Sequence, residues 1–122
     1  MDRIFFAIGA LMGALGVAFG AFGAHGLKAR VTPDLLTIWE TGAHYHLIHA
    51  LALIAASWAI QRFPGGLSVA AAWCFLFGIL IFSGSLYTLA FTGIRWLGAI
   101  TPIGGVLFIV GWVLLAVAAL KR

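Results

Sequence analysis

The chain has 122 residues, of which 64% are hydrophobic and 8% are charged, and its mean hydropathy is +1.16. This composition lies outside the range of soluble domains and predicts one domain that buries its surface against lipid. The net charge of +4 does not indicate nucleic-acid binding, because the seven lysines and arginines are scattered at segment ends and form no patch. With Cys74 as the single cysteine, a disulfide framework within the chain is excluded.

The first apolar segment, residues 4–24, is long enough to cross about 30 Å of hydrocarbon as a helix. Its apolar run is longer than the core of a usual signal peptide, so we expect it to be retained. Five glycines recur in it at spacings of four and three: Gly9, Gly13, Gly16, Gly20 and Gly23. On a helix they form a stripe about 80° wide, which predicts close packing against another helix in lipid.

The second segment spans residues 42–60, and its helix is expected to begin earlier. Thr32, Pro33 and Asp34 read as an N-cap, a proline at the first helical position and an acid in the first turn. A helix that starts there is longer than the bilayer is thick. Its opening turns are therefore expected in the interface, or the helix tilts.

A tight "RFPGG" loop leads from there into the third segment, residues 67–91, and the fourth covers residues 97–120. The last helix begins near Trp96 or, if Thr101 and Pro102 form its start, near Ile103. Taken together, residues 1–122 predict a single transmembrane domain of the all-α class. It is an integral membrane four-helix bundle with small-residue (Gly/Ala) helix packing.

The basic residues divide unevenly between the two sides that four antiparallel segments define. Arg3, Arg62, Lys121 and Arg122 lie with the termini, and Lys28, Arg30 and Arg95 lie on the other side. The positive-inside rule therefore predicts a multi-pass protein of the cell inner (cytoplasmic) membrane with both termini cytoplasmic.

Most polar side chains of the segments fall toward the side opposite the termini. We take as the candidate polar pocket His25, Tyr45, His49, Ser83, Ser85 and Tyr87. His49 lies roughly 10 Å along its segment, by the rise per residue of a helix. An ionisable side chain at such depth is a functional candidate and should face the interior of the bundle.

Three stretches carry a family resemblance: "GAFGAHGLK" at 20–28, "FSGSLY" at 82–87 and "TPIGG" at 101–105. Together with Tyr45-x-x-x-His49 they make the chain resemble the YgdD-like family of small inner-membrane proteins over almost its whole length. The resemblance implies four membrane helices and brings no enzyme activity with it. The family pattern falls on Gly20, Gly23, Ala24, His25, Tyr45, His49, Ser83, Gly84, Ser85, Tyr87, Thr101, Pro102, Gly104 and Gly105. Because His44, His46 and Glu40 lie outside it, a function common to the family should not depend on them.

Several hypotheses compete for the polar residues. A metal site could use His46-x-x-His49 with His25, but no cysteine pair helps and Glu40 points to another face. A haem would need two histidines from different helices at matching depth, which are not evident. A proton path would need polar groups through the whole bilayer, and the half near the termini is apolar apart from Ser57 and Ser68.

The favoured interpretation is that the polar side chains connect the helix ends by hydrogen bonds. Binding of lipid or a small ligand in a polar pocket is a further hypothesis. We therefore predict no cofactor and no metal. The tryptophans near segment ends, Trp39, Trp58, Trp96 and Trp112, read as residues of the membrane interface.

No nucleophile paired with a base, phosphate loop or nucleotide fingerprint occurs in the sequence, so the protein is predicted not to be an enzyme. The predicted function is that of a structural or accessory component of a membrane assembly. Its expected partners are membrane lipids and other membrane-protein subunits or further copies of the chain, and not nucleic acid. The alternative is a small solute or proton transporter that uses the His/Tyr/Ser pocket in one leaflet.

Overall fold

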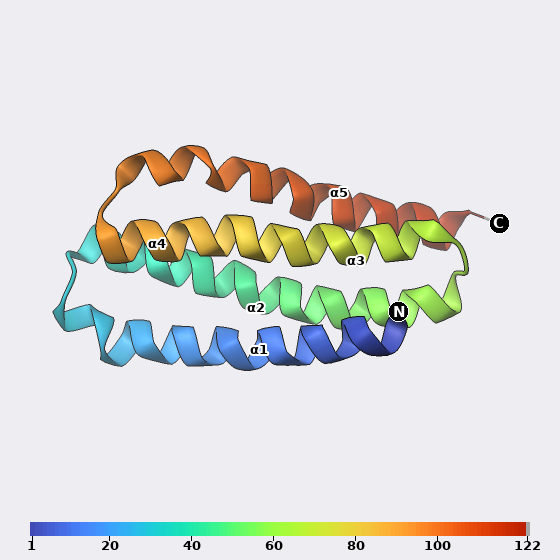
Figure 1. Cartoon of the computed structure of the whole chain (residues 1–122), viewed down its shortest axis with the longest axis horizontal. Coiled ribbons are helices and arrows are strands. Elements are labelled where there is room, and N and C mark those ends of the chain that lie inside the picture. The colour runs from blue at the N-terminus through green and yellow to red at the C-terminus, as the bar shows by residue number, and fades with distance from the viewer. Residues whose placement is uncertain (122) are drawn as a thin grey trace.

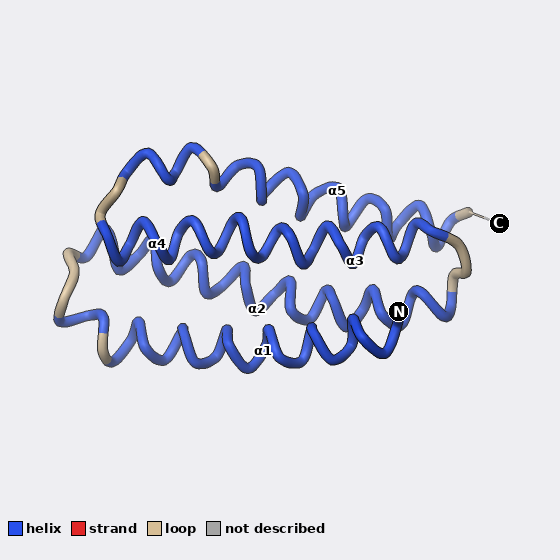
Figure 2. Tube along the Cα trace, viewed as in Figure 1, coloured by secondary structure: helices blue, strands red, loops and turns tan. Residues whose placement is uncertain are grey.

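The computed structural model describes residues 1–121 and consists of helices joined by short turns at the two ends of the molecule (Figures 1 and 2). In chain order the elements are α1 (Asp2–His25), η1 (Leu27–Ala29), α2 (Pro33–Arg62), α3 (Gly66–Gly78), η2 (Ile79–Ser83), α4 (Gly84–Thr92), η3 (Arg95–Ala99) and α5 (Thr101–Leu120). Four helical stretches are long and apolar enough to cross a membrane, which confirms the predicted all-α membrane fold. Arg122, which was counted among the basic residues near the termini, lies outside the described residues.

The third stretch, formed by α3, η2 and α4 end to end, lies beside α2 at the centre of the bundle (Figure 1). α1 packs mainly on α2, and α5 packs on α3 and η2. In the most apolar part of each stretch, 50% of the residues of α2 are buried, against 17% for α1 and 22% for α5. α2 is therefore the hub of the fold, and the first and last helices present most of their surface outward.

The start of α2 agrees with the sequence pattern. Thr32 is the extended N-cap residue, and Pro33 occupies the first helical position. At 30 residues α2 is about 45 Å long by the rise per residue, which exceeds the roughly 30 Å hydrocarbon layer. An ion pair braces its first turn, because Arg95 of η3 donates to the carboxylate of Asp34 over 2.5 Å.

The third stretch differs from the uninterrupted helix that the sequence predicted. Residues Ile79–Ser83 form a π-helical turn between Gly78 and Gly84. At this turn α5 approaches so closely that a Cβ atom on Gly104 would overlap the backbone of Phe82. π-helical turns widen a helix by one residue and are frequent at functional sites. Here the turn shifts the side chains that follow it relative to α2 and α5.

The apolar core occupies the half of the bundle nearer the chain termini. Phe5, Leu53, Ala56, Ala72 and Phe75 form its centre, and each of these side chains is buried. Small alanines on α2 and α3 allow the two helices to approach, and the two phenylalanines fill the remaining space.

Within the bundle the glycine stripe of α1 is used only in part, because Gly13 and Gly20 pack against no other helix of the chain. A Cβ atom on Gly9, Gly16 or Gly23 would lie within 2.9 Å of a side chain of α2, whereas one on Gly13 or Gly20 would meet nothing within 4 Å. The reason is geometric: residues seven apart form one row, and Gly13 lies about 40° around the helix from Gly9. α2 covers the first row only, and the second row faces outward.

This division predicts opposite effects for two similar substitutions. In Gly16→Leu the new side chain collides with Leu47 and approaches the ring of His46, so we expect a loss of roughly 1–3 kcal/mol in the free energy of unfolding. Gly13→Leu, whose side chain enters open space, should leave it within about 0.5 kcal/mol. Unfolding of the detergent-solubilised protein measures both, and equal stability of the two variants would contradict the close α1–α2 contact.

Candidate functional site

Hydrogen-bonded side chains from several helices meet in what we call the polar junction: Trp39, His46, His49, Ser83, Ser85, Tyr87, Thr101 and Trp112. His46 of α2 belongs to it, and its side chain is only 3% exposed. Its Nδ1 shares a hydrogen bond of 2.9 Å with the hydroxyl of Tyr87 on α4. The other ring nitrogen, Nε2, is buried and forms no hydrogen bond with any described residue. His46 lies outside the family pattern, yet the structure places it in the interior.

His49 is one turn further along α2 and joins it to α5. Its Nε2 accepts a hydrogen bond of 3.0 Å from the indole Nε1–H of Trp112. Because Nε2 is the acceptor, Nδ1 carries the proton and donates it over 2.8 Å to the carbonyl of Tyr45. The imidazole stacks on Phe108 at a centroid distance of 3.5 Å and an interplanar angle of 9°. Both ring nitrogens of His49 are thus occupied.

Two serines at the π-helical turn join the third stretch to its neighbours. Ser83 donates over 2.7 Å to the carbonyl of Gly42 on α2, in a fully buried contact. Ser85 and Thr101 share a hydrogen bond of 2.6 Å between their hydroxyls, which links α4 to the first turn of α5. The two bonds point to different sides of the stretch, so one short segment holds both α2 and α5.

Trp39 connects α1 to the same junction. Its indole Nε1 donates over 2.7 Å to the carbonyl of Phe19, and its ring lies 4.6 Å from that of Tyr87. The expectation that Trp39 lies at the membrane interface is wrong, because its side chain is 5% exposed and lies in the interior of the bundle. Trp112 is 45% exposed but also donates its indole N–H to His49.

The structure brings together most of the predicted polar pocket. His49, Ser83, Ser85 and Tyr87 all bond to a neighbouring helical element. Tyr45 contributes its backbone carbonyl, and its half-exposed ring packs on Phe82. His25 is exposed at the end of α1 and takes no part in these bonds. His46, Trp39 and Trp112 also belong to the site but were not part of the predicted pocket. The His-x-x-His spacing indicated His46, and no pattern in the sequence indicated the two tryptophans.

The geometry bears on the metal and haem hypotheses. Although His46 and His49 are three residues apart, His46 turns toward α4 and His49 toward α5, so they do not form a pair of converging ligands. Among residues 1–121 no group of three or more His, Cys, Asp or Glu side chains is close enough to hold a metal ion. A ligand on His49 would first have to displace the bond from Trp112.

An apolar groove of about 580 Å³ opens beside His49 between α2 and α5. Its walls include Tyr45, Ile48, Val106 and Trp112, and Phe82 lies between the two helices. The buried core of Phe5, Leu53 and Phe75 fills the terminal half of the bundle. The polar junction therefore meets packed apolar side chains in the direction of the chain termini.

The close approach of α5 to the π-helical turn predicts that alanine substitutions at two adjacent glycines of α5 change the unfolding free energy by different amounts. Gly104→Ala places a methyl group on the backbone of Phe82, which cannot move aside as a flexible side chain would, and should cost roughly 1–3 kcal/mol of unfolding free energy. Gly105→Ala reaches Phe82 only at an ordinary 3.8 Å and serves as the control. Chemical unfolding in detergent micelles gives both values, and a stable Gly104→Ala variant would exclude the close approach of α5 to η2.

Comparison with known proteins places the chain in a family. The family model described as "Protein of unknown function (DUF423)" matches residues 19–105, which include α2, the π-helical turn and the start of α5. The UPF0382 membrane protein YwdK of Bacillus subtilis (strain 168) is 45% identical over 98% of this chain and 98% of its own. A UPF0382 membrane protein of Staphylococcus epidermidis (strain ATCC 12228 / FDA PCI 1200) is 47% identical over 98% and 97%. No solved structure is significantly similar. The chain belongs to the DUF423 family of membrane proteins.

Proposed function

We propose that the protein is a structural or accessory component of a membrane assembly rather than an enzyme or a pump. The observation that carries this proposal is the use of the polar side chains. Tyr87 bonds to α2, Ser83 to α2, Ser85 to α5 and Trp112 to α2. Interhelical hydrogen bonds in membranes are modest individually, about 0.6 kcal/mol on average, but several of them fix one arrangement of the helices.

The same bonds argue against catalysis. A catalytic serine needs a base within hydrogen-bond reach, and here Ser83 donates to a backbone carbonyl while Ser85 pairs with Thr101. His49 has both nitrogens engaged and stacks on Phe108. These side chains are arranged to hold helices in place, which supports a role without chemistry.

The outer face of α1 supports association with other membrane proteins or with further copies of the chain. Gly13 and Gly20 leave open space on a helix that its own bundle covers only along one row. In lipid, small residues promote helix association because they let two backbones approach. Membrane lipids are the remaining neighbours of this face.

The cellular location follows the charge distribution. Arg3, Arg62 and Lys121 lie at the end of the bundle that carries the termini, and Lys28, Arg30 and Arg95 at the other. With Arg122 of the sequence the count favours cytoplasmic termini in the inner membrane. The narrower YgdD-like assignment also stays a prediction.

One observation favours transport of a proton or small solute as a second candidate function. The buried Nε2 of His46 has no hydrogen-bond partner among the described residues, and the other ring nitrogen bonds to Tyr87 of α4, the helix that follows the π-helical turn. Such turns are frequent at functional sites. A protonatable group inside a membrane is a candidate relay. Such a relay would have to continue through the apolar core near the termini.

Substitution of His49 distinguishes the two functions. Under the structural role, His49→Ala removes the Trp112 bond and the stacking on Phe108, so thermal stability in detergent should fall, and proteoliposomes should show no flux above empty vesicles. His44→Ala, on the exposed side of α2, should melt like the unchanged protein. Proton or solute flux that His46→Ala or His49→Ala abolishes in a folded protein would establish transport instead.

The proposed association is tested on the open row of α1. Gly20→Leu should reduce the recovery of copurifying membrane proteins, or of the dimer after cross-linking, by about tenfold, because a large side chain blocks close approach. The control is Val113→Leu, which adds bulk to an equally lipid-facing position of α5. If Gly20→Leu and Val113→Leu copurify the same proteins as the unchanged chain, the α1 face is in contact with lipid alone.

A further inference from the structure

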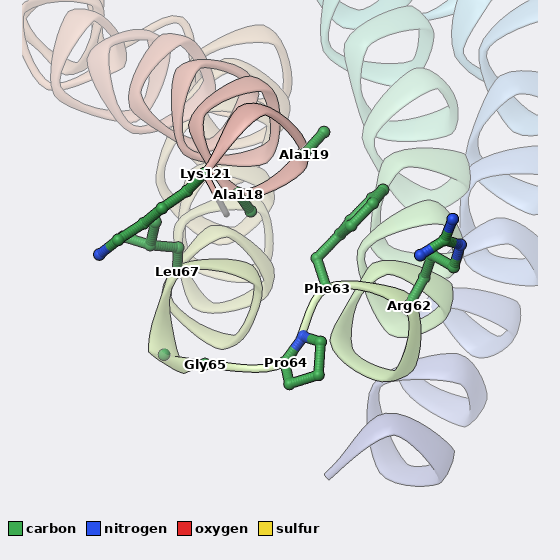
Figure 3. Close-up of a pocket in the computed structure, with 9 residues that line it drawn as sticks. Arg62, Phe63, Pro64, Gly65, Leu67, Ala118, Ala119 and Lys121 are labelled. Atoms are coloured by element: carbon green, nitrogen blue, oxygen red, sulfur yellow. The ribbon is translucent and has the colours of Figure 1, made fainter.

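A cavity lined by apolar and basic side chains lies at the end of the molecule opposite the polar junction. It has a volume of about 550 Å³ and lies between the α2–α3 turn and the last turn of α5 (Figure 3). Phe63, Pro64 and Leu67 form one side, and Ala118 and Ala119 form the other. Two alanines at the end of α5 leave the space that larger side chains would fill.

Two basic residues line the cavity, and no carboxylate among residues 1–121 forms an ion pair with either of them. Arg62 lies on its α2 side and Lys121 on its α5 side (Figure 3). The ion pairs among residues 1–121 are Met1–Asp2 and Arg95–Asp34, and neither includes these two cations. The guanidinium of Arg62 is 5.3 Å from the centroid of the Phe63 ring. No acidic residue lines the cavity, so its charge favours an anion.

The turn between the cations adds open backbone. Gly65 has a φ of +126°, which side chains other than glycine rarely adopt, and α3 begins at Gly66 without a side-chain cap. A Cβ atom on either glycine would meet nothing within 4 Å. Uncapped N–H groups of a first helical turn favour negative charge, so they reinforce the two cations.

We propose that this cavity binds the headgroup of an anionic phospholipid. The occupant follows from the surroundings: three helices that are apolar enough to span a membrane end here, which places the cavity at the depth of lipid phosphates. Arg62 and Lys121 extend to opposite sides of the cavity (Figure 3), so a phosphodiester at the Gly65–Gly66 turn would lie in the field of both cations, with the acyl chains beside Leu67 and Ala119. This site lies beyond the proposed structural role and does not depend on it.

The test uses the full chain in detergent micelles, titrated with dihexanoyl phosphatidylglycerol or dihexanoyl phosphatidylcholine. Amide resonances of Gly65 and Gly66 report binding. We expect saturable shifts with phosphatidylglycerol at an at least tenfold lower concentration than with phosphatidylcholine. The Arg62→Gln/Lys121→Gln double variant should weaken binding about twenty-five-fold, since each basic residue near an anionic lipid surface contributes roughly fivefold.

Two further variants separate the cavity from general charge. Lys28→Gln/Arg30→Gln removes the same charge from the other end of the bundle and should retain the preference for phosphatidylglycerol. Ala119→Trp fills the cavity while Arg62 and Lys121 remain, and should abolish the saturable shifts. Equal binding of the two lipids, an equal loss in the Lys28/Arg30 variant, undiminished binding in Ala119→Trp, or the same saturation with inorganic phosphate would each overturn the proposal.

Discussion

The hydrocarbon layer of a membrane offers no hydrogen-bond partners, and it also removes the apolar attraction that holds soluble helices together. Both consequences are visible in this molecule. Its helices associate where glycine and alanine let backbones approach, as at Gly104 on Phe82, and where polar side chains reach a partner on the next helix. The architecture follows from meeting these two requirements within one short chain.

α2 is the element on which both requirements converge. On one side, Gly9, Gly16 and Gly23 of α1 lie against it; on others, Ser83 and Tyr87 bond to it. Although the two buried histidines are only three residues apart, their side chains turn to different neighbours. His46 therefore engages the third stretch while His49 engages α5. α2 thus contacts every other stretch, while α5 is held mainly by α3 and η2.

The polar junction and the basic cavity lie at opposite ends of the bundle and differ in chemistry. At the junction the side chains bond to one another or to backbone carbonyls, so these hydrogen-bonding groups hold the fold. At the cavity Arg62 and Lys121 form no ion pair within the described part of the chain, so their charge is available to the surroundings. A membrane protein that uses most of its buried polar groups internally and leaves these two basic residues without an ion pair is suited to a fixed position among lipids and neighbouring helices.

Composition and segment length were sufficient to predict a membrane protein of four helices, because lipid solubility and span length depend only on residue type and number. Local signals at Thr32, Pro33 and Asp34 placed the start of α2, since a helix start is determined by its own residues. Antiparallel connectivity gathered His49, Ser83, Ser85 and Tyr87 at one side of the membrane.

Only the tertiary structure decided which face of each helix meets which neighbour. Periodicity places all five glycines of α1 on one stripe, but the rotation of α1 against α2 selects Gly16 and leaves Gly13 open. The π-helical turn at Ile79–Ser83, the burial of Trp39 and the partners of His46 and His49 depend in the same way on contacts between residues far apart in the chain. A pattern within one segment carries no information about the side chains that another segment brings to it.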